Sequence, residues 1–162
     1  MTLQELFERE GEIIVSELRK SFDRNRINAS GRLRDSLLSE AEPNRLTVSG
    51  ADYVFNVEDG TPPTKSGRPT YALQRSIKRW LDDKGIAEWE GRTRDAQAWV
   101  ISNKIAKEGS SLFRSGGNSG VLSDVINEKL LDSIAAKALR ETELNFLRGT
   151  GLSGSKNGIS NI

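Results

Sequence analysis

The side chains that could do chemistry in this chain are mainly carboxylates, because it contains neither histidine nor cysteine. Without histidine, the commonest general base near neutral pH is missing, and Ser-His, Cys-His and His-metal mechanisms are excluded. Adjacent acids occur at Asp82 and Asp83, followed by Glu88 and Glu90. A catalytic pair must share one cleft, whereas neighbouring positions on a helix diverge by about 100°. The acids therefore indicate a solvated surface. A carboxylate-dependent hydrolase remains a distant alternative, if Asp82, Asp83 and Glu88 line one pocket.

Sites for metals and phosphates are not indicated by the spacing of the residues. Asp52, Glu58 and Asp59 do not follow the pattern of a calcium loop. The glycine-rich stretch at 115–120 is neither a Walker loop nor a dinucleotide-binding fingerprint. We therefore expect no catalytic residue, no metal, no cofactor and no small-molecule substrate.

The charges are balanced overall but segregated along the chain. Lys and Arg total 24 against 23 acids, a net charge of +1. A basic block lies at 19–34, an acidic group at 52–59 and a second basic block at 61–80. Blocks of opposite sign suit head-to-tail contact between identical subunits. Scattered solvated charge remains an alternative, as does a nucleic-acid-binding accessory protein that uses the basic 19–34 segment. The basic stretches lack the interleaved aromatic residues of a single-strand reader.

Apolar residues at helical spacing predict an amphipathic helix over 2–23, which Thr2 and Glu5 would begin as a capping box. Gly11 within this helix costs about 1 kcal/mol relative to Ala. A polar connector over 25–34 follows it. Two short β-prone runs flank Glu42-Pro43-Asn44 and predict a hairpin.

The second half of the chain is predicted to be mostly helical. Residues 53–58 could form a third strand or one to two turns of helix. Their apolar spacing favours a helix that would end at Gly60, with Tyr53 and Val57 packing on the sheet. Thr61-Pro62 would prevent its continuation. Further segments are expected as follows: a loop over 61–70, a helix from 71 that stops at Gly85, a helix over 94–107 with Ala98, Trp99, Ile101, Ile105 and Ala106 inward, a flexible loop over 110–120 with Phe113 exposed, and a long helix over 122–147.

These elements predict an α+β fold: a long N-terminal helix, a small antiparallel sheet packed on one face by several helices, and an extended C-terminal tail. Residues 1–148 would form a single domain, and the Gly/Ser-rich tail over 149–162 would be ordered by neighbouring subunits. No apolar run reaches the length of a signal peptide or of a membrane span of about 20 residues. We therefore expect synthesis in the cytoplasm and no membrane contact.

Two short motifs carry a family resemblance. They are Ser30-Gly31-Arg32-Leu33-Arg34-Asp35-Ser36-Leu37 and, after the hairpin, Tyr53-Val54-Phe55-Asn56-Val57-Glu58-Asp59-Gly60-Thr61. Their order and spacing resemble the tail-completion (neck) proteins of long-tailed bacteriophages, in which TGxLRxSI precedes a hairpin and YAxxVExGT follows it. The chain departs from that pattern at 68–73, where RPTYAL replaces RPFLxPA, and in an inserted helical region at 74–108.

The resemblance implies a virion structural protein of the head–tail neck, assembled in the bacterial host cytoplasm. It implies a homo-oligomeric ring of six or twelve copies that docks onto connector and tail proteins, with DNA contact possible in the lumen and with neither catalysis nor cofactor. Tail completion, tail terminator and head-side stopper remain open as positions. The predicted interface residues are Arg24, Arg26, Arg32, Arg34, Glu58, Asp59, Lys65, Arg68, Phe113 and Arg114. The motif residues with a predicted structural role are Gly31, Leu33, Tyr53, Val57, Gly60 and Thr61.

Overall fold

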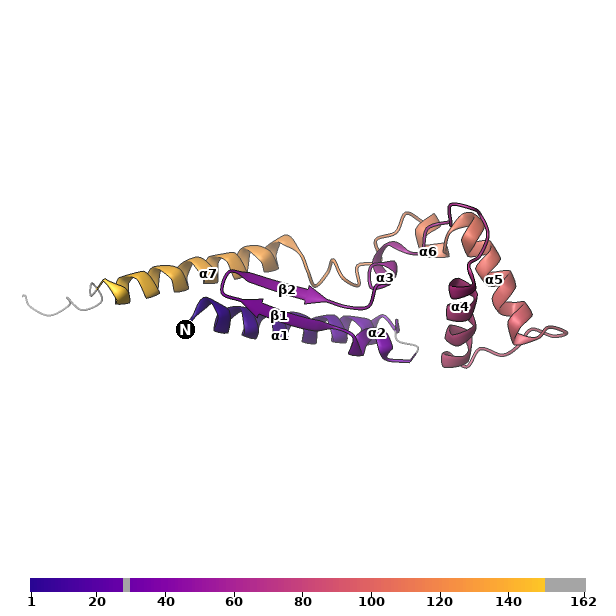
Figure 1. The fold of residues 1–162 in the computed structure, drawn as a ribbon, viewed down its shortest axis with the longest axis horizontal. Helices are drawn as coiled ribbons and strands as arrows, with labels where there is room; N and C mark the ends of the chain where they lie inside the picture. The colour runs from indigo at the N-terminus through magenta and orange to yellow at the C-terminus, as the bar shows by residue number, and fades with distance from the viewer. Residues whose placement is uncertain (28–29, 151–162) are drawn as a thin grey trace, which may run out of the picture.

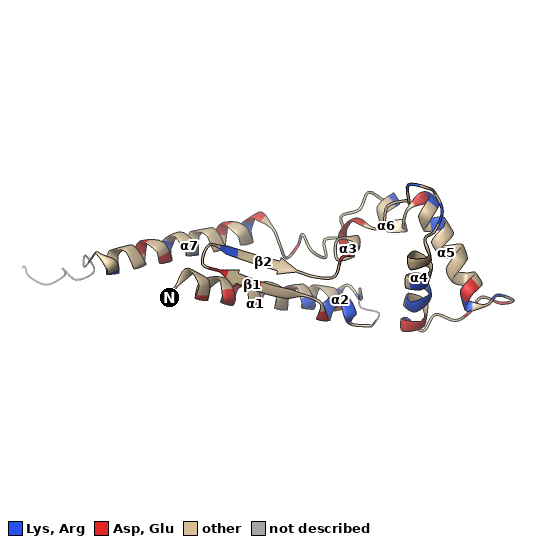
Figure 2. Cartoon of the chain, in the orientation of Figure 1, with Lys and Arg blue, Asp and Glu red and all other residues tan. Residues whose placement is uncertain are grey.

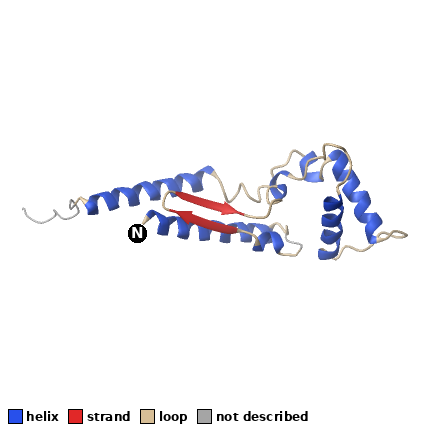
Figure 3. Ribbon diagram, in the orientation of Figure 1, coloured by secondary structure: helices blue, strands red, loops and turns tan. Residues whose placement is uncertain are grey.

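The computed structural model describes residues 1–27 and 30–150. Within them the chain is an elongated α+β molecule with two parts, a helix–hairpin body and a helical arm (Figure 1). Helices dominate, and the two strands form one small antiparallel sheet (Figure 3). The predicted C-terminal tail falls on residues 151–162, which lie outside this description.

The predicted N-terminal helix is confirmed as α1 (Leu3–Arg24). Its capping box is present, because the Glu5 amide donates to Thr2 Oγ1 at 3.1 Å and the Thr2 amide donates to the Glu5 carboxylate at 2.8 Å. One face of α1 is buried and supplies much of the core: Leu6, Ile14, Val15, Leu18 and Phe22. Capping therefore sets where the helix starts, and burial of this apolar face stabilises it.

The predicted hairpin is confirmed as β1 (Leu38–Glu42) and β2 (Arg45–Ser49), paired from Leu38 opposite Ser49 to Glu42 opposite Arg45. Side chains alternate between the two faces of the sheet, and Leu46 and Val48 pack into the core formed with α1. Gly11 allows this packing, because a Cβ there would lie 2.8 Å from Ser39 Cβ and 2.9 Å from a methyl carbon of Leu46. The helix thus keeps glycine where its backbone approaches the hairpin.

The connector before the hairpin contains a turn of helix that was not predicted, α2 (Arg32–Asp35). It begins after Gly31, whose φ is 79°, and buries Leu33 in the core. Ser36 ends it, donating from its hydroxyl to the Leu33 carbonyl at 2.7 Å and accepting from the Ala51 amide at 2.9 Å. Ser36 is therefore a junction between α2 and the far end of the hairpin rather than a strand residue.

The last long helix, α7 (Glu128–Gly149), packs against α1. The prediction that it starts at 122 was wrong, because residues 121–126 form turns and Asn127 caps the helix by accepting from the Leu130 amide at 3.1 Å. Lys137 Nζ donates to both oxygens of the buried Glu10 carboxylate, at 3.0 and 2.9 Å. Ile134 and the segment just before α7 complete the core beneath the hairpin.

The arm consists of α4 (Tyr71–Asp83) and α5 (Arg94–Glu108), which pack on each other. Two ion pairs tie them together, Lys78 with Asp95 at 2.6 Å and Arg94 with Asp82 at 2.9 Å. We predicted helices stacked on the sheet, and for these two the prediction was wrong, since the arm stands apart from the hairpin (Figure 1). Ala98 and Ala106 are buried as predicted, whereas Trp99 is 52% exposed.

Two short helices join the arm to the body. They are α3 (Asn56–Asp59), which overlaps the predicted 53–58 region, and α6 (Ser111–Arg114), in a stretch predicted to be a flexible loop. The Ser110 hydroxyl caps α6 by accepting from the Phe113 amide at 3.3 Å. The predicted helix stops at Gly60, Gly85 and Gly109 are confirmed by positive φ at all three residues.

The close approach at Gly11 can be tested by Gly11→Ala. At an exposed helix position this change would stabilise the protein by about 1 kcal/mol, but here we expect a net loss of about 1–2 kcal/mol, because the hairpin must move. Urea denaturation measures the difference. Ser16→Ala, at an exposed position of α1, is the control and should change stability by less than about 0.5 kcal/mol. A stabilised Gly11→Ala protein would contradict the close approach.

Candidate interaction surfaces

Glu58, predicted to be an interface acid, instead holds two distant segments of the chain together. Its carboxylate accepts from the Leu122 amide at 2.8 Å, from Ser123 Oγ at 2.5 Å and from Ser119 Oγ at 3.3 Å. The Ser119 amide also donates to the Glu58 carbonyl at 2.9 Å. We call this group (Glu58, Ser119, Leu122 and Ser123) the Glu58 clasp. It fixes the turns that lead into α7 against α3.

The clasp changes the ionisation of the Glu58 side chain. Burial alone would raise its pKa, but hydrogen bonds from Ser123, from the amides of Leu122 and Gly120 and from Ser119 outweigh burial. They hold the pKa of this carboxyl below its ordinary value, because each donor stabilises the charged form. The folded state therefore favours a charged Glu58.

Gly60 and Thr61, next along the chain, dock α6 onto the end of α3. The Thr61 amide donates to Ser110 Oγ at 2.9 Å, and the Ser110 amide donates to the Thr61 carbonyl at 2.8 Å. Gly60 has φ 80° and ψ 177°, a region that only glycine adopts readily. A Cβ at Gly60 would collide with the Phe113 backbone. Phe113 was predicted to be an exposed contact residue, and its ring is 40% exposed while it also packs beside Gly109.

Both sequence motifs meet at a groove between the body and the arm, with a cavity volume of about 500 Å³. We call it the motif groove. The body contributes Gly31, Leu33, Tyr53, Val57 and Thr61, and the arm contributes Leu73, Ile77 and Trp80. Tyr53 was predicted to pack against the sheet, and this was wrong, since it is 46% exposed in the groove wall. Val57 does pack against the core.

An ion pair spans the motif groove. Arg32 Nη2 on α2 lies 2.9 Å from Asp83 Oδ2 at the end of α4. A second link runs from Lys84 Nζ to the Arg26 carbonyl at 2.9 Å. Of the acids considered for catalysis, only Asp83 lines this groove, while Asp82 pairs with Arg94 and Glu88 accepts from the Arg94 backbone amide at 3.0 Å.

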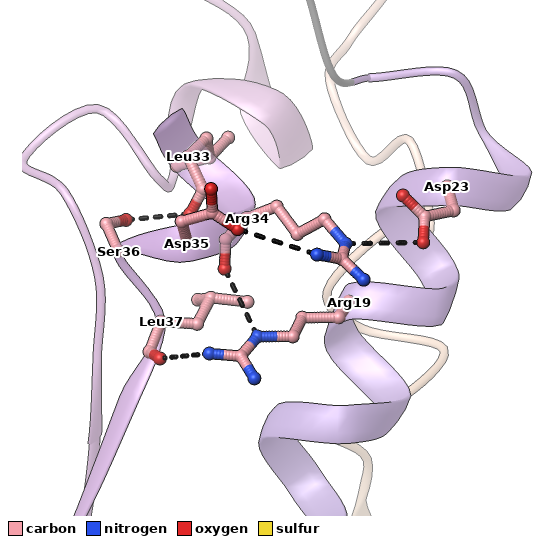
Figure 4. A network of polar contacts seen from close by, with 7 residues as sticks. All are labelled: Arg19, Asp23, Leu33, Arg34, Asp35, Ser36 and Leu37. Carbon is pink, nitrogen blue, oxygen red and sulfur yellow. Dashed lines mark hydrogen bonds and ion pairs between the residues drawn. The ribbon is translucent and has the colours of Figure 1, made fainter. Parts of the chain in front are cut away.

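The first basic block is largely engaged in contacts within the chain (Figure 4). Arg19 donates to the carbonyls of Arg34 at 3.3 Å and Leu37 at 3.1 Å, which braces α2 and the start of β1. Arg34 lies 3.3 Å from Asp23 and 3.5 Å from Asp35. Among the predicted interface arginines, Arg32 and Arg34 are thus ion-paired, whereas Arg24 and Arg26 are exposed near the end of α1.

The other predicted interface residues lie elsewhere. Asp59, Lys65 and Arg68 are exposed, and Arg114 forms an ion pair with Glu108 at 2.7 Å. The ten residues are therefore distributed over α1 and the turn after it, α2, α3, the 61–70 loop and α6. Charged residues of both signs likewise occur along the length of the described chain (Figure 2).

Large apolar side chains on the outside of α7 are the surface that sequence reasoning missed. Leu131, Leu139 and Phe146 are 55%, 67% and 67% exposed. Leu139 and Phe146 are seven residues apart and so share one side of the helix, away from the buried Ile134, and Leu131 lies between that side and Ile134. The sequence does contain a signal for this surface, because the apolar residues along 122–147 form two series on different sides of the helix. The pattern does not reveal which of the two series is buried by the rest of the chain.

Within residues 1–27 and 30–150, no group of three or more acidic, histidine or cysteine side chains is placed to hold a metal ion. No helix in the same part of the chain is long and apolar enough to cross a membrane.

No family model and no solved structure matches the chain. The thermosome subunit alpha of Thermoplasma acidophilum is similar to it, with 25% identity over 151 residues. That match covers 88% of this chain and 27% of the thermosome subunit, so the chain spans about a quarter of that protein's length. This identity does not assign the chain to a family.

The Glu58 clasp predicts a pH-dependent stability. Glu58→Gln removes the charge and one acceptor oxygen, and should lower the free energy of unfolding at pH 7 by about 1–2 kcal/mol, since the carboxylate is only partly buried. Because the pKa of Glu58 is lower in the folded state, its charge stabilises the protein at pH values above the ordinary carboxyl pKa of about 4.3. This contribution is lost as the pH falls through the pKa of the folded state. The two proteins should therefore converge in acid.

Urea denaturation at pH 7 and at pH 3 measures this convergence. Asp59→Asn is the matched control, because this neighbouring carboxylate is exposed, and it should change little at either pH. Equal stability of Glu58→Gln and the unmodified chain at pH 7 would show that the clasp does not stabilise the fold.

The backbone at Gly60 predicts a large effect of Gly60→Ala. The backbone conformation at residue 60 would cost alanine about 1–3 kcal/mol, and the new Cβ would also collide with Phe113. We therefore expect the free energy of unfolding, measured by thermal or chemical denaturation, to fall by about 3 kcal/mol or more. Gly67→Ala is the comparison, since Gly67 also has positive φ but faces open space, and it should cost about 1–2 kcal/mol. Similar losses for both variants would contradict the packing of α6 against Gly60.

Proposed function

We propose that this protein is a structural subunit of a tailed-phage virion that forms a ring at the head–tail neck and acts by contact with its neighbours. The observation that carries the proposal is the large amount of apolar surface that one copy leaves uncovered. Among the described residues this surface lies on the outside of α7, on the arm and around the motif groove. Exposed apolar surface of this extent is typical of protein–protein contact sites.

The elongated shape supports the same proposal. The arm and the body meet along the motif groove and through short linkers (Figure 1), so a single copy presents apolar faces at both ends. The motif residues that resemble the neck proteins provide structure: Gly31 begins α2, Glu58 forms the clasp, and Gly60 and Thr61 hold α6. On this proposal the motifs maintain the shape of the subunit and line the motif groove, and the other contacts lie on α7 and the arm.

The proposed mechanism is assembly without chemistry. Copies associate into a ring of six or twelve, and the ring docks onto connector and tail proteins as completion, terminator or stopper protein. No catalytic residue and no cofactor is assigned.

Nucleic-acid binding through the 19–34 segment has less support. Arg19, Arg32 and Arg34 donate to groups within the chain, which leaves fewer charges directed outward. DNA affinity that falls steeply with added salt would favour this alternative over the structural role.

The proposal predicts self-association of the purified chain at micromolar concentration. Light scattering coupled to size-exclusion chromatography should give a mass that is a multiple of 17.9 kDa, and electron microscopy should show rings. Sedimentation of a single monomeric species over a hundredfold range of concentration would contradict it.

A further inference from the structure

Two apolar surfaces of this chain lie apart from each other and differ in shape. The motif groove is concave and lies between the body and α4, while the outer side of α7 is convex and belongs to the end of the body away from the arm (Figure 1). The structure gives neither surface a partner within residues 1–27 and 30–150. Because α7 extends away from the arm, one copy does not place its own α7 face in its own groove.

The outer side of α7 is apolar although the inner side already anchors the helix. Inward, Ile134 is buried and Lys137 bonds Glu10. Towards its end, Asn145 donates to the Met1 carbonyl at 3.2 Å, so α1 supports the helix up to this point. Leu139 and Phe146 remain exposed on the other side. A helix with two apolar faces in a chain that covers only one is typical of a helix that packs between subunits.

The charges at the two surfaces are complementary. Glu143 is exposed and lies between Leu139 and Phe146 along the outer side of α7. The motif groove is edged by Arg79, which is also exposed, and α4 carries a further exposed cation, Arg75. Pairing two α7 helices would instead bring together faces that both carry Glu143, and would leave the apolar walls of the groove uncovered.

We propose that the outer face of α7 of one copy docks into the motif groove of the next copy. Leu139 and Phe146 then pack against Ile77 and Trp80, and Glu143 lies near Arg79. Such a contact is head-to-tail: each copy uses one surface as donor and the other as acceptor, and repetition closes a ring or extends a filament. This inference rests on the self-association in the proposed function and specifies the interface that produces it.

Cysteine cross-linking tests the pairing directly, because the natural chain has no cysteine. Ala135→Cys lies on the outer face one turn before Leu139, and Ser76→Cys lies in the groove wall. With a short bismaleimide, a mixture of the two single-cysteine chains should give a covalent dimer, and each chain alone should give none. A chain carrying both cysteines should give a ladder of covalent oligomers.

Other outcomes of this experiment overturn the inference. Dimers from Ala135→Cys alone would show that two α7 helices pair. Oligomers by light scattering that give no mixed cross-link would place the interface elsewhere and leave the proposed ring intact. A monomer by light scattering would remove both the interface and the proposed function.

Two sets of variants test the energetics. Phe146→Ser should raise the dissociation constant by about tenfold or more, while its thermal unfolding should be unchanged because the ring is exposed. Trp99→Ser, at an exposed aromatic position on α5, is the control and should assemble normally. Glu143→Arg should weaken assembly, and adding Arg79→Glu should restore it. Assembly that is insensitive to Phe146→Ser, or no restoration by the second charge change, would contradict this interface.

Discussion

The hydrogen bonds accepted by one carboxylate hold together the two segments of the chain that link the body and the arm. Glu58 belongs to a single turn of helix, and its donors lie more than sixty residues away in the turns that precede α7. The same turns are also held by Ser21 Oγ, which donates to the Val121 carbonyl at 2.8 Å, and Glu58 supplies the acceptor for the Leu122 amide at 2.8 Å. Hydrogen bonds to a charged carboxylate are stronger than hydrogen bonds between neutral groups. Such bonds suit a junction where little apolar surface is available. The chain therefore uses electrostatics where a small core cannot supply enough packing.

Glycine completes the same junction. At Gly60 and Gly109 the backbone adopts positive φ, and added carbon atoms would meet Phe113. These positions let α6 lie directly against the end of α3, so that the arm leaves the body with defined geometry. The motif groove results from that geometry, since its walls come from α2 and α3 on one side and from α4 on the other. The residues that resemble the neck-protein motifs thus line one wall of this groove, and the proposed contact combines that wall with the outer side of α7, which the motifs do not include.

The local elements could be predicted with good accuracy and their packing could not. The capping box at Thr2 and Glu5, the hairpin around Pro43-Asn44 and the glycine stops were all correct, because each depends on a few adjacent residues. The errors of packing share a different cause. Tyr53 and Trp99 were assigned to the core by helical spacing, yet they are exposed, because spacing shows which side chains share a face and not what that face contacts. Arg34 and Glu58 were predicted to be interface residues because they belong to blocks of opposite charge. Partners within the chain also bind them, and their interface role stays a prediction.

The sequence by itself therefore determined the α+β composition, the order of the helices and strands, and the absence of histidine and cysteine that excludes their chemistry. Only the tertiary structure decided that the arm stands apart from the sheet, that both motifs meet at one groove, and that one apolar face of α7 stays uncovered. The physical reason is the distance along the chain over which each feature depends on other residues. Caps, turns and periodicity depend on neighbours within about one or two helical turns, whereas burial depends on which distant segment occupies the space beside a given face.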